Sequence, residues 1–300
     1  MPTVFRPPRP EELESAEALV VHSINDLTQR HGFGPIATLR SCDFQLFSLE
    51  DDPEGLWLAE ADGEIRGFAF SWVCDGLWFL AELFVAPGQQ GHGVGKELLR
   101  RSFEHASKAG ASNKALITFT FNVVSQGLYI RHGLFPRFPI YFFSVPRDAS
   151  ARRLQGERLR STTIEDTACD LGRLAQIDSG ALGLSRQKHH RYLLSDSTMK
   201  GHFLHRRDEC IGYAYVCDTG HVGPVAVTQP DAAGASFTTA LHLAAATGAS
   251  QISAFLPAAA EAALGIAIEH GMRITVPMVL VSSHEFGDWT RYLPRNPGFM

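Results

Sequence analysis

The sequence is poor in cysteine, and its cysteines form no metal-binding or disulfide pattern. Five occur in 300 residues, none in a CxxC pair: Cys42, Cys74, Cys169, Cys210 and Cys217. Neither a disulfide framework nor a cysteine zinc site is therefore indicated. Histidines cluster at positions 189, 190, 202 and 205, but no carboxylates are arranged around them, so we expect no metal.

Long apolar runs and an excess of one charge are also missing. No uninterrupted apolar stretch is long enough to cross a bilayer, and the N-terminus lacks the apolar core of a signal peptide. The chain has 27 Lys and Arg against 32 Asp and Glu, a net charge of −5, with no strongly basic face. We therefore expect a cytoplasmic protein with neither a nucleic-acid nor a membrane partner.

What is present is an ordinary globular composition, 45% hydrophobic and 20% charged, at a length that suggests two domains. In the first half, the pattern predicts a helix over 10–27, a hairpin over 56–73 with its turn at Asp62-Gly63, and a strand over 77–85. A helix ending near 109, a strand over 115–121, a helix over 123–131 and a strand over 140–145 follow. The strand–helix–strand order predicts a right-handed crossover between parallel strands.

The second half repeats the first. Gly110-Ala111-Ser112 recurs as Gly248-Ala249-Ser250, and His132-Gly133 as His270-Gly271, both at an offset of 138 residues. Two segments in register at one offset indicate two copies of one fold. The arginine-rich stretch between the copies predicts a solvated linker, with an anion-binding arm as the alternative. We place the domains at 1–147 and 161–300, joined by a linker over 148–160.

A glycine-rich segment, Gln90-Gly91-His92-Gly93-Val94-Gly95, lies between the predicted strand over 77–85 and the helix that follows it. A phosphate group needs several backbone N–H groups that point at it, and glycine lets the chain approach closely enough to supply them. The N-terminal end of the following helix adds the positive end of its dipole. A glycine string alone is a weak signal, because many such strings are simply turns.

Three elements together resemble the GCN5-related N-acetyltransferase (GNAT) superfamily. The glycine-rich segment is similar to its Arg/Gln-x-x-Gly-x-Gly/Ala motif, and residues 80–85 to its fourth strand. Residues 122–134 resemble its second motif, Asn-x-x-Ser/Ala-x-x-Leu-Tyr-x-x-x-Gly-Phe. The resemblance, over roughly residues 5–145, implies an α/β (α+β) fold of two tandem GNAT-like domains, each a mixed, mostly antiparallel central sheet flanked by helices.

The resemblance also implies acetyl-CoA as cosubstrate. The backbone of residues 90–96 would bind its pyrophosphate, and residues 83–85 would pair with its pantetheine arm as an added strand does. A backbone N–H near Val85 would polarise the thioester carbonyl, as in an oxyanion hole. The implied cofactor-binding residues are Leu83, Phe84, Val85, Gln90, Gly91, His92, Gly93, Val94, Gly95, Lys96, Asn122, Ser125 and Tyr129.

Two residues are candidate catalytic groups. Glu82 is the candidate base toward the amine, because burial on a strand raises the pKa of a carboxyl toward neutrality. Tyr129 is the candidate acid toward the departing thiolate, because a phenol stays protonated at the relevant pH values. The structural alternatives are that Glu82 binds a bulge or a backbone amide, that Tyr129 is a core tyrosine, and that Lys96 is an exposed first-turn lysine. Asn122 has a further role open to it as a helix N-cap.

The second copy lacks the corresponding groups. The residues at the 138-residue offset from Asn122, Ser125 and Tyr129 are all alanines: Ala260, Ala263 and Ala267. The counterpart of the glycine-rich segment keeps one glycine and contains Pro230, which has no N–H to donate. We therefore expect a degenerate second domain that binds no CoA.

These features predict an acetyl-CoA-dependent N-acetyltransferase that acts by direct transfer on a primary amine of a small molecule. A second domain beside the cleft favours an enclosed pocket and hence a small acceptor. The alternatives are a protein or peptide N-acetyltransferase and a non-catalytic acyl-CoA sensor, which would need neither Glu82 nor Tyr129. The identity of the acceptor, and whether the protein is a monomer or a homodimer, are left open by the sequence.

Overall fold

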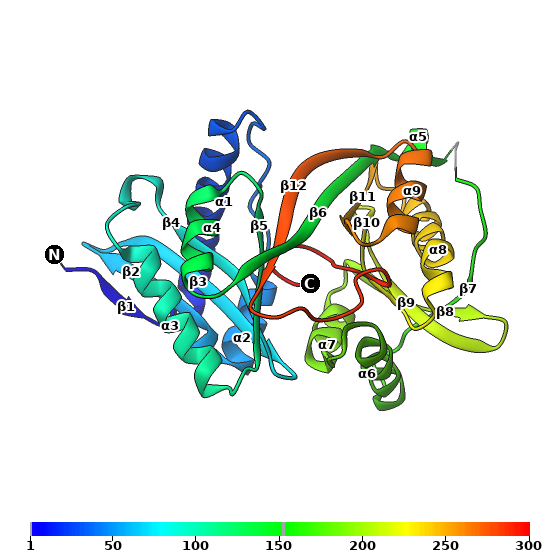
Figure 1. The fold of residues 1–300 in the computed structure, drawn as a ribbon, viewed down its shortest axis with the longest axis horizontal. Coiled ribbons are helices and arrows are strands. Elements are labelled where there is room, and N and C mark those ends of the chain that lie inside the picture. The colour runs from blue at the N-terminus through cyan, green and yellow to red at the C-terminus, as the bar shows by residue number, and fades with distance from the viewer. Residues whose placement is uncertain (1, 152–153) are drawn as a thin grey trace. The chain divides into compact units, whose positions relative to one another are not determined.

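The structure is a computed structural model that describes residues 2–151 and 154–300. By their contacts the residues form two compact units (Figure 1). The first unit comprises Met1–Phe135 and Val281–His284, and the second comprises Pro136–Leu280 and Glu285–Met300. Arg152 and Arg153 of the predicted linker lie outside the described residues. No helix in the described part of the chain is both long and apolar enough to cross a membrane.

The first unit is a mixed sheet with helices on both faces. Its strands are ordered β1-β2-β3-β4-β5, with β1 to β4 antiparallel neighbours and β4 parallel to β5. The strands are β1 (Val4–Arg6), β2 (Leu56–Ala61), β3 (Glu64–Cys74), β4 (Leu77–Val85) and β5 (Asn113–Phe119). The helices are α1 (Leu13–Arg30), α2 (Asp43–Asp51), α3 (Val94–Lys108) and α4 (Val123–Arg131), with 3-10 turns at Pro10–Glu12, Pro53–Gly55 and Pro87–Gln89.

The alternation of side chains along β3 explains which helix covers which face of this sheet. Gly67 leaves room for α3, because a Cβ at this position would come within 2.9 Å of Leu98 Cδ1. Phe70, three residues on, points to the opposite face, where its ring centroid lies 5.3 Å from that of Phe44 in α2. The sheet is therefore covered by α3 on one face and by α2 on the other.

A β-bulge interrupts β4 near its middle. Glu82 pairs with Phe70 of β3, but Leu80 pairs with the very next β3 residue, so Ala81 is the extra residue. A bulge of this kind changes the direction of the strand and of the side chains that follow. The parallel pairing of β4 with β5 ends at Leu80. Among the described pairings, the β5-side edge of β4 is therefore open from the bulge to the end of the strand.

The second unit repeats this order of elements. Its strands are ordered β12-β6-β11-β10-β9-β8-β7, with β13 paired to β10. The strands are β6 (Phe135–Pro146), β7 (Arg160–Thr163), β8 (Met199–Arg206), β9 (Glu209–Cys217), β10 (His221–Val227), β11 (Gln251–Pro257), β12 (Arg273–Ser282) and β13 (Tyr292–Leu293). The helices are α5 (Arg147–Ala151), α6 (Ala168–Leu182), α7 (Gln187–Ser195), α8 (Ala233–Ala246) and α9 (Glu261–Glu269), with a 3-10 turn at Pro230–Ala232.

The repeat predicted from the sequence is confirmed by the elements themselves. The elements β11, α9 and β12 each begin 138 residues after β5, α4 and β6. The parallel crossover between β4 and β5 is also confirmed. The contacts assign residues 136–146, which hold most of β6, to the second unit. The helix α2 was not predicted from the sequence, because its buried residues Gln45 and Ser48 are polar and give no apolar period.

Candidate functional site

A cleft of about 410 Å³ opens in the first unit beside the end of β4, the glycine-rich segment, α1 and α4. Residues predicted from the sequence form part of its lining: Leu83, Phe84, Val85, Gln90, Gly91, Gly93, Gly95, Lys96, Asn122 and Ser125. The other lining residues were not among the predicted cofactor contacts: Ser23, Leu27, Arg30, His31, Gln89, Phe121, Val123, Val124, Leu128 and Arg131.

The glycine-rich segment has the backbone conformation that an anion site needs. Gly91 and Gly93 have φ angles of +83° and +85°, in the left-handed region that favours glycine. A Cβ at either position would meet nothing within 4 Å, so the requirement is conformational rather than one of space. The first N–H of this region with a backbone partner is that of Glu97, which donates to the carbonyl of Gly93 over 3.1 Å.

The preceding N–H groups are left without partners. Among the described residues, those from 90 to 96 donate no backbone hydrogen bond outside the regular elements. Three of these residues form the first turn of α3, whose N–H groups have no partner within the helix. A run of unpaired donors and a helix N-terminus therefore face the cleft together, which is the arrangement that binds a phosphate.

The side chains around the cleft are basic or neutral. Lys96 and Arg131 line it, and neither forms an ion pair with a described residue. Arg30 also lines it, although its guanidinium binds Asp26 Oδ2 over 2.7 Å. No carboxylate is among the lining residues. The cleft therefore favours an anionic ligand on charge as well as on backbone geometry.

The start of α4 places two polar side chains at the cleft. Asn122 Oδ1 accepts a hydrogen bond from the Ser125 N–H over 3.3 Å, which confirms Asn122 as the helix N-cap. Tyr129 lies one helical turn further, is 4% exposed and does not line the cleft. Burial raises the pKa of the Tyr129 phenol well above its usual range, and a hydrogen bond with the Ser125 side chain only partly offsets this. The phenol therefore stays protonated and is connected to the cleft through Ser125.

Glu82 follows the bulge in β4 and contacts neither a bulge amide nor another backbone N–H among the described hydrogen bonds. Instead its Oε1 accepts a hydrogen bond from Gln45 Nε2 over 3.2 Å, and Oε2 is buried with no partner among the described residues. Burial, and then the charge of Glu17, raise the pKa of the Glu82 carboxyl to about 8, although the Gln45 hydrogen bond opposes this. Glu82 therefore holds a proton at neutral pH and releases it in mildly alkaline solution.

The structure separates the predicted residues into two groups. Most of the predicted cofactor contacts gather at the cleft, whereas Tyr129 and Glu82 are not among its lining residues. Two members of the glycine-rich segment do not line the cleft: His92 is exposed, and Val94 is buried against Leu98 in the core. Arg131 lines the cleft but was not predicted from the sequence. Helical spacing offers a signal for it, because Arg131 lies three residues after the lining residue Leu128 and hence on the same face of α4.

The corresponding edge in the second unit is filled by the chain itself. β10 pairs with β11 only over His221 and Val222, as β4 does with β5 at its start. Beyond that point Val225 and Ala226 pair with β13, and the Val227 N–H donates to the carbonyl of Arg291 over 3.1 Å. The edge that is open in β4 is thus closed in β10.

The second unit also lacks the loop that carries the unpaired N–H groups. In the first unit four residues, 90–93, separate the 3-10 turn at Pro87–Gln89 from α3. In the second unit α8 begins directly after the 3-10 turn at Pro230–Ala232. The missing glycines predicted from the sequence are therefore accompanied by a missing loop.

A buried charge network occupies the second unit near β9 and β13. Arg186 and Asp178 are 1% and 0% exposed, and Arg186 Nε donates to Asp178 Oδ2 over 3.1 Å. His190, Tyr213 and Tyr292 complete the network through hydrogen bonds to this pair. Burial raises the pKa of Asp178, but the charges of Arg186 and His190 outweigh it and hold the pKa well below its usual range. Each group is satisfied within the core, which indicates a structural role.

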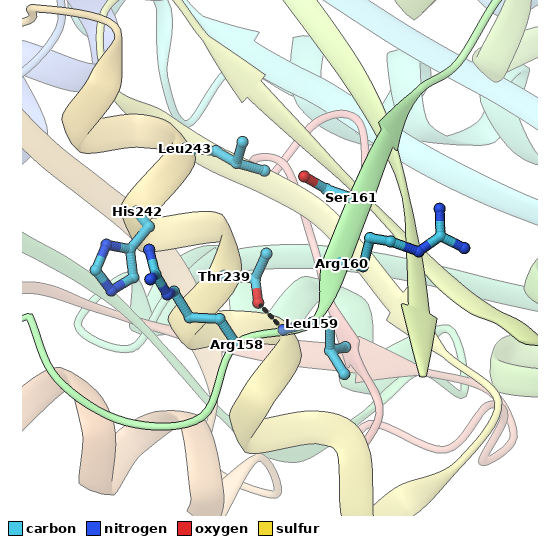
Figure 2. A pocket seen from close by; sticks show the side chains of 7 residues that line it. All are labelled: Arg158, Leu159, Arg160, Ser161, Thr239, His242 and Leu243. Carbon is cyan, nitrogen blue, oxygen red and sulfur yellow. Dashed lines mark hydrogen bonds between the residues drawn. The ribbon is translucent and has the colours of Figure 1, made fainter. Parts of the chain in front are cut away.

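A second cavity, of about 600 Å³, lies in the second unit where β7 begins beside α8. Figure 2 shows the side chains of Arg158 and His242 together on one side of it, while the Arg160 guanidinium points away. The Leu159 N–H donates to Thr239 Oγ1 over 2.9 Å and fixes the entry to β7. Arg158 and Arg160 are exposed, and the lining offers neither a carboxylate nor a glycine-rich turn. We place the candidate chemistry in the cleft of the first unit.

Comparison with known proteins agrees with this geometry. Residues 21–134 match the model of the acetyltransferase (GNAT) family. A mycothiol acetyltransferase from Streptomyces avermitilis is 36% identical over 84 residues, which are 27% of this chain and 27% of that protein. The chain thus aligns with about a quarter of the length of this curated relative.

Two solved structures resemble nearly the whole chain. One, from Pyrococcus horikoshii and described as a candidate acetyltransferase, has a TM-score of 0.78 at 16% identity and covers 99% of this chain and 96% of its own. The other, a tandem GNAT protein from the clavulanic acid biosynthesis pathway, has a TM-score of 0.63 at 13% identity, with 94% and 98% covered. At these identities the likeness establishes the fold, including its two-unit form.

Proposed function

We propose that the chain, whose residues 21–134 match the model of the acetyltransferase (GNAT) family, transfers an acetyl group from acetyl-CoA to a primary amine of a small molecule. The observation that carries the proposal is the run of unpaired N–H groups over residues 90–96, which opens on the same cleft as the free edge of β4. Neither feature serves the packing of the first unit. Together they suit a ligand with a phosphate at one end and an amide-bearing arm at the other.

The residues at the cleft fit acetyl-CoA, which supplies an acetyl thioester when it is bound. The backbone of residues 90–96 would hold the pyrophosphate, with Lys96 and Arg131 adding positive charge. The open edge of β4 over Leu83, Phe84 and Val85 would pair with the pantetheine amides. Asn122 Nδ2, which makes no hydrogen bond with the described residues, is free to bind the same arm while Oδ1 caps α4.

Two groups that do not line the cleft would move protons in the reaction. Once the Glu82 carboxyl, whose pKa is about 8, has ionised, its buried and unpartnered Oε2 is the acceptor for the amine proton. Tyr129 is the donor toward the departing thiolate, because its phenol stays protonated and is hydrogen-bonded to Ser125 at the cleft. An acyl-CoA sensor would require neither group, so the presence of both favours catalysis.

The second unit is proposed to be a degenerate copy over residues 161–300 that binds no CoA. Its loop is missing and its β10 edge is occupied by β13, so both backbone features used in the first unit are absent from its described residues. We therefore propose one acetyl-CoA site in each chain and a structural role for the second unit.

The experiment is an assay of CoA release from acetyl-CoA over a panel of amines, amino acids, aminoglycosides and peptides. The Gly93→Asp variant is the matched negative control, since it places a side chain and a negative charge at a left-handed glycine in the loop. We expect turnover with at least one small amine and none with Gly93→Asp. Turnover confined to peptides would favour the protein acetyltransferase, and no turnover with bound acetyl-CoA would favour the sensor.

A further inference from the structure

Two residues from separate helices converge on the carboxyl of Glu82. Gln45, on α2, donates from Nε2 both to Glu82 Oε1 and to Glu17 Oε2 on α1, each over 3.2 Å. Gln45 and Glu17 are 8% and 9% exposed, so both hydrogen bonds are formed by buried side chains. The three side chains form a carboxylate–amide–carboxylate clamp, a name kept here for Glu17, Gln45 and Glu82.

The clamp leaves one oxygen of Glu82 free. Oε1 is held by Gln45, whereas Oε2 is buried and has no partner among the described residues. A buried carboxyl oxygen without a partner is unfavourable for stability alone, which makes it a candidate for function. A carboxyl that is held at one oxygen presents the other in a fixed direction, as a proton acceptor requires.

We propose that Gln45 and Glu17 are positioning residues that orient the Glu82 carboxyl so that its Oε2 takes the proton from the acceptor amine. The inference rests on the proposed acetyl transfer. Neither residue belongs to the sequence motifs that point to the cofactor site. Gln45 fixes the direction of the carboxyl, and Glu17 adds a nearby negative charge.

The two positioning residues act on the proton affinity of Glu82 in opposite directions. The negative charge of Glu17 disfavours ionisation of Glu82, whereas the Gln45 hydrogen bond favours it. Two further groups lie nearby on the segment before α2. Burial raises the pKa of the Glu17 carboxyl, and the charge of Arg40 only partly offsets this. Burial, then the charges of Glu17 and Glu82, raise the pKa of the Cys42 thiol to about 11, so it is neutral where Glu82 titrates.

The test compares Glu17→Gln, Gln45→Met and a control, Glu14→Gln, in the full chain. Glu14 is an exposed acid three residues before Glu17 on the same helix. Its charge acts on Cys42 but is not among the charges that shift the pKa of Glu82, so its variant loses the same charge without changing the clamp. The Glu82 carboxyl is followed by NMR in protein labelled with carboxyl-¹³C glutamate, its signal being the one that Glu82→Gln removes. The pH dependence of kcat/KM is measured with the best amine of the panel. Acetyl-CoA binding, which uses other residues, verifies that each variant is folded.

We expect the Glu82 titration and the rising limb of kcat/KM to move together. Both should shift to lower pH in Glu17→Gln and to higher pH in Gln45→Met, each by on the order of a tenfold change in proton affinity. Glu14→Gln should move neither the Glu82 titration nor the rising limb of kcat/KM. If Gln45→Met fails to fold, Glu17→Gln still decides the matter. A purely structural role would change stability without moving the limb.

The ways of failing are distinguishable. If the rising limb of kcat/KM lies at the wild-type pH in both Glu17→Gln and Gln45→Met while turnover is intact, the inference is overturned and the proposed function stands. A Glu82 signal that moves while the limb does not also overturns it, because Glu82 is then not the base. No turnover with any amine refutes the proposed function, and with it the catalytic purpose of the clamp.

Discussion

Replacing Glu82 with glutamine tests the buried carboxyl through stability rather than activity. Its pKa is about 8 in the folded protein against an ordinary value of 4.5. The folded protein therefore holds a proton that the unfolded chain has already lost, and the free energy of unfolding falls as pH rises between these values. At 1.36 kcal/mol per pKa unit, the loss over the whole window is on the order of 5 kcal/mol. Glutamine keeps the shape and an oxygen for Gln45 but does not ionise.

The assay is urea unfolding of the wild type, Glu82→Gln and the exposed-acid control Glu14→Gln at about pH 5, 7 and 9. Titrating groups that are not coupled to Glu82 are common to all three proteins and cancel in the differences. The unfolding free energy of Glu82→Gln relative to wild type should rise by roughly 4 kcal/mol from pH 5 to pH 9, with most of the change complete by pH 8. The control should show a constant difference. A Glu82→Gln difference that is independent of pH would refute the account of a buried, protonated carboxyl.

Three further substitutions test other parts of the account. Tyr129→Phe should lower turnover by on the order of a hundredfold in steady-state kinetics, with little change in the CoA affinity measured by calorimetry. Wild-type turnover at all pH values would remove Tyr129 as the acid. Asn122→Asp keeps an N-cap acceptor but replaces the amide donor, so CoA binding should weaken by on the order of tenfold while thermal stability holds; unchanged affinity would contradict the contact. Asp178→Asn leaves Arg186 buried without a counter-charge, so the free energy of unfolding, measured by urea unfolding, should fall by about 3–5 kcal/mol. A fall of less than about 1 kcal/mol would contradict the buried network.

The parts of the site that are local in sequence were predictable. The strand over 77–85, the glycine turn and the helix over 123–131 follow from short-range patterns, and the structure has β4 and α4 at these same residues. The two left-handed glycines explain why the pattern is informative, since the turn needs φ angles that other residues adopt only with strain. The elements β11 and α9 lie at the 138-residue offset from β5 and α4, in agreement with the predicted repeat.

The parts that depend on long-range packing were not predictable. Gln45 meets Glu82 across 37 residues and Glu17 across 28, and no spacing in the chain signals either contact. The closure of β10 by β13 was missed for the same reason, because a two-residue strand carries no period. Its effect is nonetheless consistent with the prediction that the second copy binds no CoA, which itself rested on lost side chains, lost glycines and Pro230.

The glycine-rich turn as the single CoA site is tested most directly by titration calorimetry of coenzyme A into the wild-type chain and the Gly93→Asp variant. We expect one site per chain in the wild type, because the second unit lacks the loop and its β10 edge is occupied. Binding should be abolished in Gly93→Asp, since the change blocks the turn and adds a like charge. Two equivalent sites in the wild type, or wild-type affinity in Gly93→Asp, would contradict this assignment.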